Sequence, residues 1–278
     1  MAIEQFIGLK KRPCRCLSKR HAYFVGLAFA LTGMRSHAID TGPGVFSFST
    51  GFDFSSGDYG DTEDTDIWYV PFLFRYEWFP LTARLTVPYL EITGPGGVVV
   101  GDGRPLVVGP TSAPRTTETG IGDVVASVMY SFEPPPTSLI PFIDLTFKVK
   151  FPTADESRGL GTGSYDYIFQ ADVSESFGML TPLAGFGYKL KGDAPGVPLD
   201  NVFFAFGGLA YKFTDQLTSG AFLDWQENAS AAADDALEFS PYFTWKFNPT
   251  WSFTGYGVVG FTDGSPDEGG GVQIKYTP

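Results

Sequence analysis

Residues 141–152 read Pro141-Phe-Ile-Asp-Leu-Thr-Phe-Lys-Val-Lys-Phe-Pro152, and their pattern sets the expectation for the rest of the chain. Hydrophobic and polar side chains alternate one for one. Successive side chains of a β-strand point to opposite faces, so this segment has one apolar and one charged face. About 10 residues, rising ~3.3 Å each and tilted ~45°, span roughly 23 Å, close to the ~25 Å apolar band of an outer-membrane barrel. The segment therefore predicts a transmembrane β-strand with its apolar face in lipid.

The same alternation recurs along the chain. Twelve segments carry it, near residues 46–55, 68–78, 81–89, 124–132, 141–152, 165–174, 184–191, 202–213, 217–226, 237–247, 251–261 and 272–276. Short turns alternate with longer polar loops, one of them the Gly- and Pro-rich stretch 94–119. The pattern predicts an all-β protein, an antiparallel up-and-down transmembrane β-barrel of 12 strands. The segment 202–213 is apolar on both parities, so its facing stays open.

A secreted β-sandwich also shows alternating strands. In a sandwich, however, the apolar face of every strand has to meet a second sheet across a thin core. Twelve segments, nearly all with several large apolar side chains on one parity and aromatic residues at the ends, fit lipid better. We therefore prefer the barrel.

The first 38 residues predict a cleavable signal peptide. Basic residues between Lys10 and Arg20 precede the apolar run 22–31, and Ser36-His37-Ala38 places small residues at positions −3 and −1 of a cleavage site. We expect residues 39–278 to form the outer-membrane barrel as one domain. Both cysteines and both histidines of the chain fall in the part removed.

Charge and residue types exclude several classes of function. Seven of the 19 Lys and Arg residues and one of the 31 Asp and Glu residues precede the cut, which leaves 12 basic and 30 acidic residues and a net charge of −18. Such an acidic chain does not suit nucleic acid. Without histidine or cysteine, Ser–His catalysis and zinc binding lack their usual groups. We expect no enzyme activity, no catalytic residue, no cofactor and no metal site.

The loop 58–66 clusters five carboxylates. It lacks the twelve-residue pattern of an EF-hand, and a solvated acidic loop at the cell surface is the more ordinary interpretation. Whether it binds a cation stays open.

The polar parity of the strands predicts which charged side chains line the barrel interior. The candidate lumen and constriction residues are Asp53, Arg75, Glu77, Arg84, Asp123, Asp144, Lys148, Lys150 and Asp166. Two interpretations stay open for them. They either form a paired network that fills a narrow lumen, or they form a constriction that selects solutes by charge and shape. If Phe142, Phe204 and Phe206 also point inward, the lumen carries an apolar track suited to poorly soluble solutes.

Several short motifs resemble those of one family. They are Gly57-Asp-Tyr-Gly60, Val70-Pro71, Val87-Pro-Tyr89, Gly94-Pro95, Gly122-Asp123-Val124, Lys148-Val-Lys-Phe-Pro-Thr153, Gly161-Thr-Gly163 with Asp166, and Gly192-Asp193. In this order they resemble the outer-membrane transporters named for the meta-cleavage pathway of phenol degradation. The resemblance implies a Gram-negative outer-membrane barrel that admits aromatic or other hydrophobic compounds, and it brings no catalytic residue. The chain departs from the aromatic last residue common in outer-membrane proteins, since Thr277 and Pro278 follow Tyr276.

These observations predict an outer-membrane channel or transporter, with both mature termini in the periplasm, through which small aromatic or hydrophobic solutes diffuse. Expected partners are outer-membrane lipid and lipopolysaccharide, the barrel assembly machinery and the solutes. The alternative is a structural or surface-interaction barrel with a charge-plugged lumen and ligand-binding outer loops. The solute, the openness of the lumen and the oligomeric state stay open.

Overall fold

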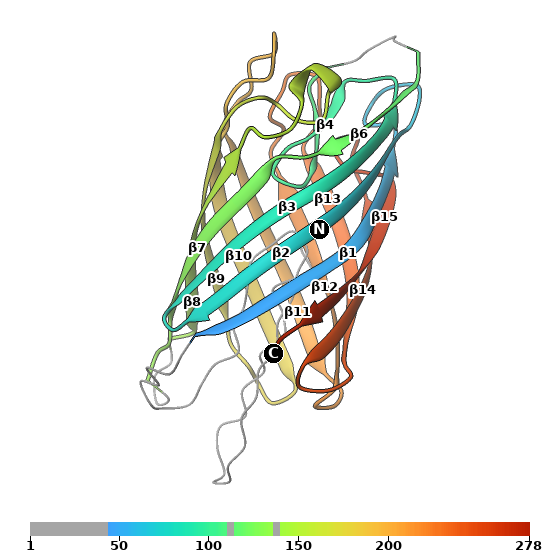
Figure 1. Cartoon of the computed structure of the whole chain (residues 1–278). Coiled ribbons are helices and arrows are strands. Elements are labelled where there is room, and N and C mark those ends of the chain that lie inside the picture. Colours follow the sequence, from blue (N-terminus) through green and yellow to red (C-terminus); the bar gives the residue numbers. More distant parts are fainter. Residues whose placement is uncertain (1–43, 110–113, 136–139) are drawn as a thin grey trace.

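Figure 1 shows a tall barrel of tilted antiparallel strands. This computed structural model describes residues 44–109, 114–135 and 140–278. The predicted signal peptide lies outside these residues. The strands are β1 (Val45–Gly57), β2 (Thr65–Trp78), β3 (Leu81–Gly94), β4 (Val98–Val100), β5 (Pro105–Val107), β6 (Thr116–Ile121), β7 (Val124–Phe132), β8 (Phe142–Phe151), β9 (Asp166–Ser174), β10 (Leu180–Leu190), β11 (Val202–Lys212), β12 (Leu217–Gln226), β13 (Ala236–Lys246), β14 (Trp251–Gly260) and β15 (Glu268–Tyr276), and one 3₁₀ turn, η2, spans Glu156–Arg158.

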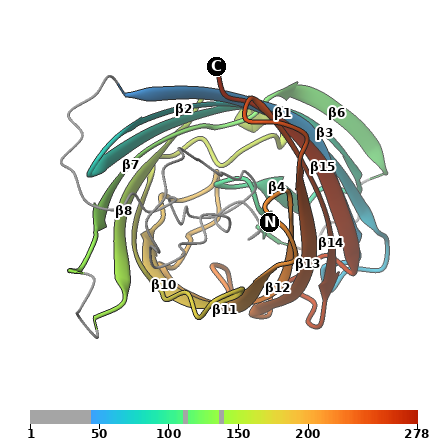
Figure 2. The same cartoon turned by 90° about the horizontal axis from the view of Figure 1, so that it is seen from below.

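The sheet closes on itself. Wall strands pair with their neighbours in sequence, and β1 pairs with β15, with Phe48 opposite Tyr276. Both β6 and β7 pair with β3 and together make the fourth position of the wall, which gives twelve positions in the described part of the chain. Figure 2 shows the closed ring from below. The predicted 12-strand antiparallel barrel is confirmed.

A β-bulge separates β6 from β7. Ile121 lies opposite Tyr89 and Val125 opposite Thr86, so three residues of one strand face two of the other. The Gly122 N–H donates to the Pro88 carbonyl at 3.0 Å across the bulge. The fourth strand therefore begins at residue 116, within the stretch that the sequence had indicated as a loop.

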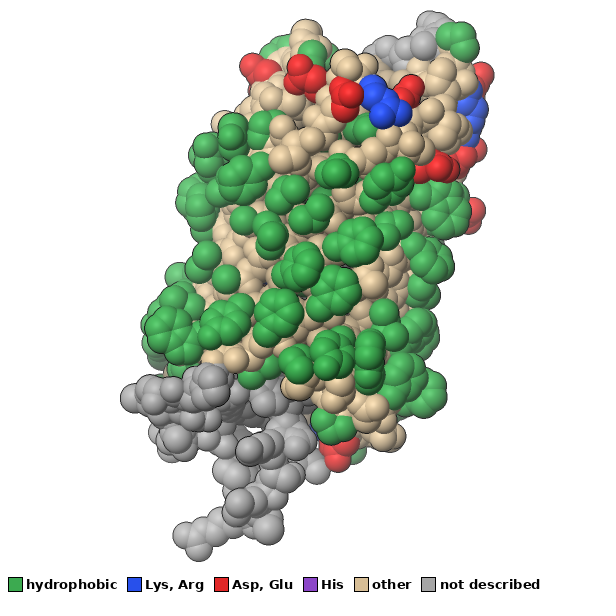
Figure 3. Space-filling view, viewed as in Figure 1, with side chains coloured by type: hydrophobic (Ala, Val, Ile, Leu, Met, Phe, Trp, Pro, Cys, Tyr) green, Lys and Arg blue, Asp and Glu red, His purple; other side chains and the backbone are tan. Residues whose placement is uncertain are grey.

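Apolar side chains cover the outer wall. In β8, the Phe147 side chain is 40% exposed whereas Asp144, on the opposite parity, is 4% exposed. In β11, the undecided strand, Phe203 and Leu209 point outward and Phe206 points inward. Figure 3 shows hydrophobic side chains over the wall, with acidic and basic ones gathered near the upper end. This belt fits a hydrocarbon layer. In the described ranges, no helix has the length and apolarity needed to cross a membrane.

The two ends of the barrel differ. Connections 79–80, 175–179, 213–216 and 247–250 are short and form the short-turn end. Val45, the first strand residue, pairs with Glu77 beside one of these turns, and Tyr276 pairs with Trp251 beside another. Both ends of the barrel wall therefore lie at the short-turn end, and the longer connections lie at the opposite, long-loop end.

One long connection folds into the barrel. Strands β4 and β5 form a hairpin, residues 98–107, which we call the inserted hairpin. It lies inside the ring of wall strands in Figure 2. Apolar clusters hold both of its faces: Val98, Val100 and Val107 belong to one cluster with Leu90, and Val99 and Leu106 belong to another with Val202. The interior at the long-loop end is therefore filled by protein rather than by water alone.

Candidate functional site: the lumen around the inserted hairpin

The turn of the inserted hairpin presents two opposite charges to the lumen. The Gly101 N–H donates to the Arg104 carbonyl at 2.9 Å, and Gly103 has φ 87°, a left-handed conformation that glycine adopts without a Cβ clash. This tight turn carries Asp102 and Arg104 at the deepest part of the hairpin. The local sequence thus folds so that a carboxylate and a guanidinium stand two residues apart.

Asp102 binds the barrel wall at β10. Its two carboxylate oxygens lie 2.9 and 3.2 Å from the Lys189 Nζ on β10. Lys189 also donates to the Gln226 side chain on β12 at 2.6 Å, and its Nζ lies 5.3 Å from the centre of the Phe204 ring. The Lys189 side chain is 4% exposed, so its contacts with Asp102 and Gln226 are shielded from water.

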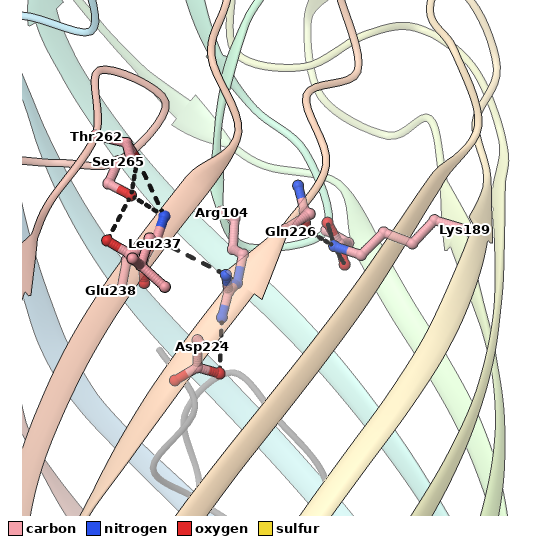
Figure 4. Close-up of polar contacts among 9 residues, drawn as sticks. Arg104, Lys189, Asp224, Gln226, Leu237, Glu238, Thr262 and Ser265 are labelled. Carbon is pink, nitrogen blue, oxygen red and sulfur yellow. Dashed lines mark hydrogen bonds and ion pairs between the residues drawn. The ribbon is translucent and has the colours of Figure 1, made fainter.

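Arg104 binds the next strands of the same side of the wall, β12 and β13. Its guanidinium lies 3.4 Å from Asp224 on β12 and 3.8 Å from Glu238 on β13, and Figure 4 shows it aimed at these acids. The β13 end that carries Glu238 is fixed in turn, because the Leu237 N–H donates to the Ser265 hydroxyl at 2.9 Å. We call the Asp102–Lys189 and Arg104–Asp224–Glu238 contacts the latch.

The two charged residues of the hairpin turn, Asp102 and Arg104, are held in the ionised state. Burial alone would raise the pKa of Asp102, but the positive charges of Lys189, Lys191 and Lys148 hold that pKa well below its usual range. Burial alone would lower the pKa of Arg104, but Glu238 and Asp224 raise it further. Asp102 and Arg104 therefore stay charged at neutral pH.

Four basic side chains lie on one row of paired residues across the wall, here called the basic row. Arg75 on β2 is directly opposite Arg84 on β3, and the row continues through Ser127 and Lys148 to Ile168 and Lys189. Because barrel strands are tilted, such a row climbs from the short-turn end toward the long-loop end. Like charges directly opposite each other destabilise a sheet. Stability alone therefore does not account for the placement of Arg75 and Arg84.

Three of the predicted lumen residues form a sealed network. The Lys150 Nζ lies 3.2 Å from Asp123 and 3.3 Å from Asp166, and the lysine side chain is 0% exposed. Asp166 also lies 3.6 Å from Lys191, and the Ala154 N–H donates to Asp123 at 3.0 Å. This placement favours the structural interpretation for Asp123, Lys150 and Asp166, because they offer no accessible surface to a passing solute.

The remaining predicted charges lie on the inner face in smaller groups. Arg75 pairs with Glu77 at 2.9 Å. Asp53 accepts a hydrogen bond from the Tyr256 hydroxyl. Asp144 lies directly opposite Asp172 on β9. In the described residues, no group of three or more His, Cys, Asp or Glu side chains comes together as a metal ion would require.

The predicted phenylalanine track is not continuous. Phe204 and Phe206 point inward, over Gly187 and Gly185 of β10, where a Cβ would lie only 2.3 and 2.4 Å from the rings. Phe142 shares the inward parity but begins β8 at the short-turn end. Phe204 lies near the long-loop end, so the structure brings two of the three rings together.

Two hollows flank the latch. The first, of about 350 Å³, is lined by both latch residues of the hairpin together with Lys148, Lys189, Phe204 and Phe206. The second, of about 410 Å³, lies on the other side of Arg104, between Asp53, Tyr69 and Glu238. Sequence reasoning missed Asp102 and Arg104. The available signal was the Gly-Asp-Gly-Arg turn between two apolar triplets, which indicates a hairpin but not that it inserts.

Comparisons with known proteins agree with this architecture. The family model described as "Putative MetA-pathway of phenol degradation" matches residues 49–277. Similar solved structures include the COG4313 outer membrane channel from Pseudomonas putida F1, with 14% identity, a TM-score of 0.60 and coverage of 88% of this chain and 100% of that chain. The NanC porin shares 13% identity at a TM-score of 0.52, covering 84% of this chain and 99% of that chain. None of the curated proteins matches.

Proposed function

Because this chain belongs to the family described as "Putative MetA-pathway of phenol degradation", we propose that it is an outer-membrane channel through which small aromatic or hydrophobic solutes diffuse. The fold it shares with outer membrane channels supports the proposal, as does the apolar belt of the wall. The family description names phenol degradation, and the proposed solute class, small aromatic or hydrophobic compounds, is inferred from that description.

The observation that carries the proposal is the latch. A single hairpin lies in the lumen, its tip is held by ion pairs to three strands on one side of the wall, β10, β12 and β13, and hollows remain on both sides of Arg104. A barrel whose interior served only as filling would gain more from continuous apolar packing, because buried ion pairs often stabilise no better than hydrophobic residues of similar volume. Ion pairs at a hollow instead present charge and shape to a solute that passes it.

The second candidate function is a structural or surface-interaction barrel with a plugged lumen. The apolar clusters that hold both faces of the inserted hairpin favour it, since they fix the hairpin in place. The two candidates differ in one measurable property, the passage of ions and solutes through folded protein.

We assign the short-turn end to the periplasm, which places both mature termini there. This assignment is supported by the usual arrangement of short periplasmic and longer outer connections. Lipid and lipopolysaccharide would then surround the apolar belt, and the barrel assembly machinery would receive the last strand, β15.

Single-channel recording in planar bilayers tests the proposal. Refolded protein, checked by heat-modifiable gel mobility, is expected to give discrete current steps in KCl. Added catechol is expected to reduce the current more than the sugar arabinose does, because the first hollow is lined by two phenylalanine rings. Folded protein that gives no current steps would leave the plugged barrel as the better account.

A further inference from the structure

The basic row ends at a carboxylate that the protein itself supplies. From Arg75 near the short-turn end the row climbs to Lys189, where Asp102 of the inserted hairpin sits. The row crosses five successive strand pairings on the inner face. Four of its six residues are basic, in a chain that is acidic as a whole, and Ser127 and Ile168 fill the other two positions.

The place that the Asp102 carboxylate occupies beside Lys189, here called the seat, has the features of a carboxylate-binding site. Lys189 contacts both oxygens, and the charges of Lys191 and Lys148 also act on this carboxylate. Lys191 is close to the turn, since its Nζ lies 3.7 Å from the Cβ position at Gly101. One ammonium group thus contacts the carboxylate directly, Lys148 lines the same hollow, and hydrogen bonds to ionised groups in such a shielded place are strong.

An apolar surface adjoins the seat. The Phe204 ring lies 5.3 Å from the Lys189 Nζ, Phe206 packs edge-on against Phe222 at 6.2 Å, and both inward rings line the 350 Å³ hollow that also contains Lys148. A molecule in this hollow would have rings beside its body and ammonium groups beside its polar end.

We propose that Asp102 occupies the seat of a solute carboxylate and that the channel takes small organic anions with an apolar body. The inference rests on the proposed channel function and names its solute class. An entering carboxylate replaces Asp102 on Lys189, while its body lies against Phe204 and Phe206. The apolar clusters and the Arg104 ion pairs still hold the hairpin, but its tip is released from Lys189, and the path beside β10 opens.

The test measures single-channel current in KCl with benzoate as the probe. Benzamide has the same ring without the charge, and acetate has the charge without the ring. Benzoate is expected to increase the open fraction at lower concentration than acetate, and benzamide is expected to have no such effect. Equal responses to benzoate and benzamide would overturn the inference, and so would equal responses to benzoate and acetate.

Two variants separate the inference from the channel function. Asp102→Asn is expected to be open without benzoate and to gain nothing from it. Lys189→Met removes the same contact from the other partner, so it is also expected to be open without benzoate and to gain nothing from it. Asp215→Asn, at an exposed acid of a short turn, is the matched control and should behave as the wild type.

The outcomes are distinguishable. If neither the wild type nor Asp102→Asn conducts while both are folded, the channel function fails together with the inference. If both conduct and Asp102→Asn responds to benzoate as the wild type does, the inference alone is overturned.

Discussion

Asp102 and Arg104 stand two residues apart and bind side chains of opposite charge on nearby strands of the barrel wall. Asp102 meets the basic side at Lys189, and Arg104 meets the acidic pair Asp224 and Glu238. Asp224 and Glu238 are directly opposite each other across β12 and β13, so each depends on the guanidinium for charge balance. One turn therefore brings a counter-charge both to Lys189 and to the acidic pair on the neighbouring strands.

Arg104→Ala should destabilise the protein by about 3 kcal/mol, because removal of one partner leaves uncompensated buried charge. Reversible urea unfolding in lipid vesicles measures the change. Arg158→Ala removes a solvent-exposed ion pair with Glu118 and should cost less than ~1 kcal/mol. Equal costs for the two variants would show that Arg104 is not a buried counter-ion.

Gly187→Ala should destabilise the barrel by about 1–3 kcal/mol through overpacking, because the new Cβ would lie 2.3 Å from the Phe204 ring. Gly207→Ala is the control on the neighbouring strand, where the nearest atom to the new Cβ is 4.0 Å away. The same unfolding measurement applies. A tolerated Gly187→Ala would mean that Phe204 does not lie against β10.

At the scale of the strand, period-two alternation was enough to predict the wall. It failed where alternation is not the governing signal. β6 is short and mostly polar, Thr116-Thr-Glu-Thr-Gly-Ile121, so its sequence predicts a loop rather than a strand. The inserted hairpin has apolar residues on both faces because it packs inside the barrel between two clusters.

Parity also predicted the inward side chains but not their surroundings. Lys148 and Lys150 share one face of β8, yet Lys150 is sealed between two aspartates while Lys148 lines a hollow. The difference comes from loop 152–165 and from the inserted hairpin, whose positions depend on tertiary packing. Sequence spacing along a strand carries no information about such contacts.

Phe147→Arg tests the outward face of β8. A charged side chain in mid-strand on the lipid side should cost about 2–4 kcal/mol, whereas the same substitution at Phe177, in a short turn, should cost ~1 kcal/mol or less. Unfolding free energies in vesicles give both values. Similar costs at the two positions would contradict a lipid-embedded strand at residue 147.

At the scale of the molecule, the orientation of the barrel decides what the long-loop end meets. Both cysteines of the chain precede residue 17, so the described wall can carry a single introduced thiol. Glu63→Cys, in a long connection, should react with a membrane-impermeant maleimide in intact cells, and Asp215→Cys, in a short turn, should react only after lysis. The reverse pattern would place the long-loop end in the periplasm.

The whole barrel is organised around one inserted element, since two apolar clusters and both sides of the latch converge on it. If the inserted hairpin narrows the path, removing it must widen the path while the twelve-position wall stays closed. Its two strands, β4 and β5, pair only with each other and take no part in the pairing of the wall strands described here.

Replacement of residues 98–107 by a Gly-Ser segment of equal length, followed by single-channel recording in KCl, tests this claim most directly. We predict a conductance several-fold above that of the wild type, in protein whose gel mobility shows a folded barrel. An unchanged conductance in the folded variant would contradict the account, because the narrowest part of the lumen would then lie elsewhere.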